Sequence, residues 1–260
     1  MTRQPAPPPW GDEPLSRFLY EAQFNERVSA LNYSGPFTFL QRLHATYLKS
    51  CDAIEKGANE DSLLPGVLMI RAHSACLAGT RLALSGQGPE AHSVLRTAIE
   101  QAWYALHIAE DPTPFARADV WLRRDEGEEA KTRCKHEFSA GRVRRTHEKR
   151  DPVSARQAHE LYKRTIDYGA HPNHFGVLAV MKRQEGSHST TFLSALLAPD
   201  QLNTVFALQS AAHVGLAGLG VFRLVFPSRL ELAGVDLEIE SLRRDIDAVF
   251  KPFAQSRDTP

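Results

Sequence analysis

Apolar residues recur at intervals of three and four along most of the chain, and this spacing is typical of amphipathic helices. Turn residues separate the apolar stretches, as in "SGQGPEA" at 85–91. Proline at the start of a stretch, as at Pro14 and Pro89, suits the first turn of a helix. The pattern predicts helices over approximately these residues: 13–28, 36–56, 62–85, 89–109, 115–129, 130–148, 153–168, 199–226 and 237–254.

Strand-like alternation of apolar and polar residues is nearly absent. The exception lies near 189–193, where Thr190 to Leu193 favour a short strand or an extended loop. No repeat at a fixed period is found, which argues against a helical solenoid. The sequence therefore predicts an all-α fold, an irregular multi-helix bundle in a single domain over 13–260. Residues 1–12 are rich in proline, so we expect a mobile, extended arm before that domain.

The most apolar stretch is "ALQSAAHVGLAGLGVFRLVF" at 207–226. This stretch is long enough to span a membrane, but Gln209, His213 and Arg223 interrupt its apolar character, and such polar residues are costly in a bilayer. The small residues Gly215 and Gly218 instead suit a helix that other helices approach closely. We therefore expect a buried central helix and no membrane partner.

Composition changes this picture little. The 260 residues are 42% hydrophobic and 24% charged, as in an ordinary globular protein, and the formal net charge of zero excludes attraction of the whole molecule to nucleic acid. Three cysteines, Cys51, Cys76 and Cys134, lie far apart, so neither a disulfide framework nor a zinc ribbon is expected. The N-terminal residues lack the apolar core of a signal peptide, and we expect a cytoplasmic protein.

Polar side chains form a stripe on the predicted helix at 89–109. Arg96, Glu100, Trp103 and His107 follow one another at intervals of four, three and four residues, which places them on one side of the helix. A solvent-exposed face explains charged residues there. The aromatic Trp103 instead indicates a partly covered face, where Arg96 presents its guanidinium to an anion or to another helix. Arginine before glutamate is the weaker order for such a pair, so a third partner is expected.

Two further groups of basic residues are candidates for anion binding. Arg71 and Arg81 share a face of the predicted third helix and are either surface arginines or, facing Arg96, one wall of an anion pocket. The segment "KTRCKHEFSAGRVRRTHEKR" (Lys131 to Arg150) contains eight Lys or Arg residues against two Glu. It is a candidate RNA- or DNA-binding surface, with a solvent-exposed charged face as the alternative.

Metal and cofactor sites are not indicated. His171 and His174 in "HPNH" have a spacing found in metal ligands, but no third ligand can be named. The di-iron pattern Glu-x-x-His occurs once, at Glu185 and His188. Glycine-rich loops of the nucleotide-binding types are absent. We therefore expect no bound metal and no cofactor.

The stretch "VLRTAIEQAWYALHI" and the later "LYKRTIDYGAHPN" together resemble uncharacterised all-α bacterial families that are similar to the HEPN superfamily. The resemblance implies a HEPN-like helical bundle with Arg96, Glu100, Tyr168 and His171 as site residues. Many HEPN proteins are ribonucleases or components of toxin–antitoxin and phage-defence systems. HEPN ribonucleases resemble one another in an Arg followed after four to six residues by His, a spacing that Arg164 and His171 match.

Two functions are consistent with these residues. The first is a non-catalytic ligand-binding or protein-interaction module of a defence or toxin–antitoxin system, with Arg96, Glu100, Trp103 and Tyr168 as ligand-binding residues. The alternative is a metal-independent ribonuclease, in which His171 is the general base on the ribose hydroxyl and Arg164 stabilises phosphate charge. A homo-oligomer, most simply a homodimer, would then complete the site.

The stretch "YGAHPN" at 168–173 also has a purely structural explanation. Gly169 favours the left-handed conformation that ends helices, and Pro172 prevents continuation. His171 then binds one of the last helical carbonyls. In this interpretation the stretch is a helix stop and carries no chemistry.

Overall fold

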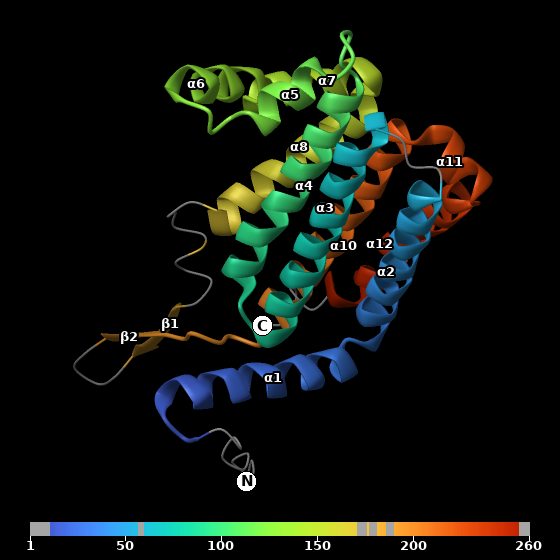
Figure 1. Cartoon of the computed structure of the whole chain (residues 1–260). Helices are drawn as coiled ribbons and strands as arrows, with labels where there is room; N and C mark the ends of the chain where they lie inside the picture. Colours follow the sequence, from blue (N-terminus) through green and yellow to red (C-terminus); the bar gives the residue numbers. More distant parts are fainter. Residues whose placement is uncertain (1–10, 57–59, 171–175, 177–180, 186–189, 255–260) are drawn as a thin grey trace.

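The structure is a computed structural model of the chain, and it describes residues 11–56, 60–170, 176, 181–185 and 190–254. Most of these residues are helical, which confirms the predicted all-α multi-helix fold (Figure 1). Residues 1–10 of the expected arm and His171 lie outside the described residues. The helices are α1 (Pro14–Asn32), α2 (Ser34–Glu55), α3 (Glu60–Ser85), α4 (Gly88–Ala109), α5 (Ala116–Leu122), α6 (Glu128–Glu137), α7 (Ala140–Arg150), α8 (Pro152–Thr165), the π-helical turn η1 (Ile166–Ala170), α10 (Gln201–Val225), α11 (Pro227–Leu232) and α12 (Val235–Ala254).

The centre of the bundle is formed by α3, α4 and α10, and α2, α8 and α12 pack around α10. Both α3 and α10 contain stretches long and apolar enough to cross a membrane, but 78% of the α10 stretch is buried within the bundle, against 44% for α3. The predicted buried central helix is therefore α10. The outward side of α3 carries several exposed apolar residues: Leu63, Val67, Ile70 and Leu77.

Glycines on α10 allow α2 to approach closely. A Cβ on Gly215 would lie 2.6 Å from Leu43 Cδ2, and a Cβ on Gly218 would lie 2.5 Å from the Tyr47 hydroxyl. Both distances are shorter than a van der Waals contact, so only glycine fits without a shift of the neighbouring helix. The Tyr47 hydroxyl donates a hydrogen bond of 2.8 Å to the Gly215 carbonyl oxygen, which joins the two helices at this level.

The polar part of the chain between α4 and α8 differs from the prediction. The sequence pattern predicts helices over 115–129 and 130–148, whereas the structure has α5, α6 and α7, with a break at Phe138 and Ser139. Phe138 is buried at this break and packs against the rings of Tyr104 and His107 on α4. Its carbonyl oxygen accepts a hydrogen bond of 3.2 Å from the Tyr104 hydroxyl. The pattern misses the break because the stabilising contacts come from a distant helix.

A two-stranded antiparallel hairpin follows the η1 region, formed by β1 (Met181–Glu185) and β2 (Thr190–Ser194). Met181 pairs with Ser194, and Glu185 pairs with Thr190. The predicted extended stretch near 189–193 is thus a strand over its described residues. The partner strand β1 has no alternation of apolar residues, and neither it nor the short α11 is predicted by the pattern. The hairpin extends to one side of the bundle (Figure 1).

Candidate functional site

A groove of about 550 Å³ runs between α8, α10 and α12. Part of its lining is apolar, with Leu161, Leu216 and Ile246. The charged and titratable groups that line it are Arg156, Glu160, Arg164, His213, Arg243 and Asp247. Three guanidinium groups therefore face two carboxylates in the same space. This excess of positive charge beside an apolar wall suits an anionic ligand with an apolar part.

Arg164 has no carboxylate partner within the part of the chain that the structure describes. Its guanidinium carbon lies 5.9 Å from the centre of the Phe206 ring, which is a cation–π distance. Two other charges of the groove are paired, since Arg243 donates to Glu240 at 2.7 Å and Glu160 accepts from Lys163 at 3.1 Å, whereas Arg156 and Asp247 have no ion pair with a described residue. Arg164 is therefore available to pair with an incoming anion.

His213 contributes a half-buried imidazole to the groove. Its Nδ1 lies 2.9 Å from the carbonyl oxygen of Gln209 one turn earlier, so Nδ1 carries the proton and donates it. Nε2 has no hydrogen-bond partner among the described residues. Burial lowers the pKa of His213, the bond to Gln209 raises it, the neighbouring charge of Arg164 lowers it, and Asp247 raises it, with a net lowering. The neutral ring thus offers Nε2 as an acceptor, and after protonation as a donor.

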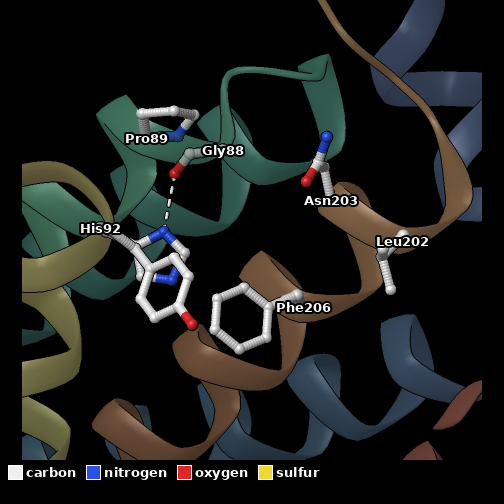
Figure 2. Close-up of a pocket in the computed structure, with 7 residues that line it drawn as sticks. Gly88, Pro89, His92, Leu202, Asn203 and Phe206 are labelled. Atoms are coloured by element: carbon white, nitrogen blue, oxygen red, sulfur yellow. Dashed lines mark hydrogen bonds between the residues drawn. The ribbon is translucent and has the colours of Figure 1, made fainter. Parts of the chain in front are cut away.

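A second, smaller cavity of about 140 Å³ lies where η1 meets the beginnings of α4 and α10 (Figure 2). The rings of Tyr168 and Phe206 are 4.7 Å apart in an edge-to-face arrangement, and the His92 ring lies 5.3 Å from Phe206. Gly88, Pro89, Leu202 and Asn203 complete the lining. The cavity is therefore walled mainly by aromatic rings and opens to solvent beside Leu202, which is 51% exposed.

His92 is a structural member of this cavity. Its Nδ1 donates to the Gly88 carbonyl oxygen at 2.8 Å, the bond drawn in Figure 2, and its Nε2 accepts from the Ser210 hydroxyl at 3.1 Å. Burial lowers the pKa of His92, with an opposing contribution from the Gly88 carbonyl and a further lowering by the charge of Arg164. Both nitrogens are already bonded, so His92 holds α4 against α10.

Because Gly169 has no side chain, the turn η1 can pack closely against the start of α4, and this packing positions Tyr168 at the cavity. A Cβ at this position would overlap the carbonyl oxygen of Pro89 and lie 2.9 Å from His92 Cβ. Gly169 lies within the helical turn η1 and is not among the residues with positive φ, so the expected left-handed helix end at this position is wrong. The turn is held against the start of α4 by close packing. How the chain proceeds at His171 and Pro172 lies outside the described residues.

The predicted stripe on α4 forms a network of its own. Arg96 Nε donates to Glu100 Oε1 at 2.8 Å, and the Tyr162 hydroxyl of α8 donates to the same oxygen at 3.1 Å. The Arg96 guanidinium also lies 5.2 Å from the centre of the Tyr162 ring. Tyr162 is thus the expected third partner of the pair. Arg96 and Glu100 line neither the groove nor the cavity described above, and their contacts with Tyr162 join α4 to α8.

Trp103 continues this network into the core. It is buried, and its Nε1 donates to His147 Nδ1 at 3.1 Å, while His147 Nε2 lies 2.9 Å from the Ser154 hydroxyl. Of the predicted ligand-binding residues, Tyr168 lines the cavity, and the other three line neither the cavity nor the groove. Arg164, predicted as catalytic, lines the neighbouring groove. The structure brings these two together but separates them from Arg96, Glu100 and Trp103.

The other basic candidates are mostly paired or exposed. Arg81 binds Glu26 of α1 at 2.9 Å and Arg71 is exposed, so neither forms an anion pocket with Arg96. In the segment 131–150 the guanidinium of Arg142 binds Glu137 at 2.7 Å, and Arg150 binds Glu110 at 3.2 Å. The basic residues of α6 and α7 that have no ion pair with any described residue are Arg133, Lys135, Arg145 and Lys149. Within the described residues no group of three or more His, Cys, Asp or Glu side chains could hold a metal ion.

The sequence analysis missed the partners of Arg164 and Tyr168. In the sequence, His213 is marked only as a polar residue in an apolar helix, and no pattern marks Phe206.

The fold and groove define an all-α bundle protein with a basic groove that contains one histidine. Comparison of the chain with protein-family models, curated proteins and solved structures finds no match. The site is therefore assigned from its own geometry.

Proposed function

We propose that this protein is a non-catalytic ligand-binding module that takes up an anionic small molecule in the groove between α8, α10 and α12. The observation that carries the proposal is that the Arg164 guanidinium and the Nε2 of His213 line the same groove, and neither has an ion pair or hydrogen bond with a described residue. An arginine with fixed surroundings binds phosphate or carboxylate through two parallel hydrogen bonds. His213 adds a third contact when it is protonated.

A calorimetric titration of the purified protein with inorganic pyrophosphate tests this proposal. We expect saturable binding that weakens as salt is added, because the groove charges are partly exposed and are screened. Arg164→Gln should weaken binding by about tenfold to a hundredfold, the usual value of a hydrogen bond to a charged group. Arg145→Gln removes the same charge from an exposed position of α7 and should leave affinity unchanged. Equal affinities for the two variants would exclude the groove as the site.

The second candidate is a metal-independent ribonuclease that uses Arg164 with His171, as the HEPN resemblance implies. It is supported by the same Arg164 guanidinium, which has no carboxylate partner among the described residues, and an arginine of this kind can stabilise phosphate charge. The unpaired cations of α6 and α7 would then hold RNA. Incubation with total cellular RNA in EDTA tests it, because cleavage by the wild type should be lost in Arg164→Gln and in His171→Ala. Absence of cleavage by the wild type would leave binding as the function.

A further inference from the structure

The groove and the cavity of Figure 2 are consecutive parts of one seam between two antiparallel helices. On one side, Tyr168 follows Arg164 by four residues, which is about one helical turn. On the other side, Phe206 precedes His213 by seven residues, or about 10 Å along α10. Tyr168 contacts Phe206 at the cavity end, and the Arg164 guanidinium lies 5.9 Å from the centre of the same Phe206 ring.

Arg164 is the junction between these two parts. Its charge lowers the pKa of His92 in the cavity and of His213 in the groove, which places one guanidinium within electrostatic reach of both. Its distance of 5.9 Å from the Phe206 ring ties it to the wall of the cavity as well. A ligand bound to Arg164 therefore lies next to the aromatic cavity.

The cavity itself suits a flat ring. Its volume of about 140 Å³ is that of a few water molecules, which have about 30 Å³ each, and it matches one small ring system. Its walls are the rings of Tyr168, Phe206 and His92, and aromatic walls bind flat π-systems through stacked or edge-on contacts. Asn203 and Tyr168 also contribute polar side chains to the lining.

We infer that the ligand is an aryl or heteroaryl phosphate, with its anion on Arg164 in the groove and its ring in the cavity, packed against the contacting rings of Tyr168 and Phe206. This inference rests on the proposed function, since it names the ligand class of the same site. One molecule can carry both the ring and the charge, because the Arg164 guanidinium of the groove lies 5.9 Å from the centre of the Phe206 ring of the cavity. Simple aryl phosphates and purine nucleotides share this chemistry.

The test compares ligands that carry the ring, the charge or both. Calorimetric titrations would use phenyl phosphate, adenosine 5′-monophosphate, glycerol phosphate and phenol with the wild-type protein. We expect the two ring-bearing phosphates to bind about tenfold tighter than glycerol phosphate, the usual gain from stacking on an aromatic side chain, and phenol to bind weakly. Tighter binding of the nucleotide than of phenyl phosphate would assign the ring as a nucleobase, and the reverse order would assign it as a simple aryl group.

Variants separate the two parts of the site. Phe206→Leu should remove the advantage of phenyl phosphate over glycerol phosphate and leave the affinity for glycerol phosphate within about twofold. Arg164→Gln should weaken both phosphates alike. Phe24→Leu, at an exposed phenylalanine of α1, is the matched control and should change neither affinity. Circular dichroism and thermal unfolding of each variant establish that it is folded.

Two outcomes would overturn the inference, and they differ from failure of the proposed function. Equal affinity of the wild type for phenyl phosphate and glycerol phosphate would refute the ring site while the anion site stands. An advantage of phenyl phosphate that persists in Phe206→Leu would place the ring elsewhere. Failure of every phosphate to bind would instead refute the proposed anion site itself.

Discussion

Acidification should destabilise this fold in part through the buried His147, whose contribution can be isolated by substitution. His147 on α7 is 0% exposed and accepts a hydrogen bond at Nδ1 from Trp103 Nε1, 3.1 Å away. An indole N–H can only donate, so Nδ1 must be unprotonated, and the ring proton lies on Nε2, which donates to the Ser154 hydroxyl at 2.9 Å. Protonation of Nδ1 would set two N–H groups against each other. The native state therefore requires the neutral ring.

The size of the effect follows from the pKa of His147. Burial lowers this pKa from 6.5 to about 4, although Asp151 and Glu148 oppose the shift. The unfolded chain then binds more protons between these two values, so the stabilisation is complete above pH 6.5 and is lost as the pH falls toward 4. Between about pH 7.5 and pH 5 the loss is about 2 kcal/mol, and it approaches about 3 kcal/mol below pH 4.

Urea unfolding followed by circular dichroism at about pH 7.5 and pH 5 measures this loss. His147→Gln keeps an acceptor for Trp103 and a donor for Ser154 but cannot titrate, so its free energy of unfolding should fall by about 2 kcal/mol less than that of the wild type. His136→Gln changes an exposed histidine of α6 and should show the wild-type loss. Equal losses in the wild type and His147→Gln would refute the reasoning, because the buried ring would then carry no pH-dependent stability.

Two further substitutions test the close packing at Gly169 and the ion pairs of Glu137. Gly169→Ala should lower the free energy of unfolding by about 1–3 kcal/mol in urea titrations, because its Cβ would overlap the Pro89 carbonyl. Gly141→Ala, in α7 with no contact closer than 3.5 Å, should instead be neutral or stabilising. Glu137→Gln should cost about 1–3 kcal/mol in thermal unfolding, because Glu137 binds Arg117 at 3.2 Å and Arg142 at 2.7 Å. The exposed Glu129→Gln is its control, and equal stability of the two variants would contradict this role.

The helices that the sequence predicts well are those with a strong apolar stripe. The range 89–109 differs from α4 by one residue, and 207–226 lies almost entirely within α10. Their periodicity is local information, because residues three and four apart share a face. The region between α4 and α8 is less predictable. It has few apolar residues, and the break after α6 depends on the contact of Phe138 with Tyr104 and His107.

Only part of the candidate site can be predicted from the sequence, for a similar reason. Arg164 and Tyr168 are close in sequence, and a motif can contain both. Their partners Phe206 and His213 lie on α10, across a hairpin and a chain reversal, and no spacing rule connects them. Arg96 and Glu100 show the opposite case, since their pairing is visible from the interval of four while the closing contact from Tyr162 is not.

Hydrogen bonding separates the histidines that hold the fold from the one in the groove. His92 and His147 have both ring nitrogens bonded to fixed partners, and neither can change its protonation or bind a ligand without loss of a structural bond. His213 uses Nδ1 for the Gln209 carbonyl and keeps Nε2 without a described partner, beside an arginine that also lacks one. Leaving a donor or acceptor unmatched costs free energy, and the cost is smallest where a ligand or water completes the bond. The pair of His213 and Arg164 combines unmatched polar groups with a groove open to a ligand, and it is where we expect a ligand to bind.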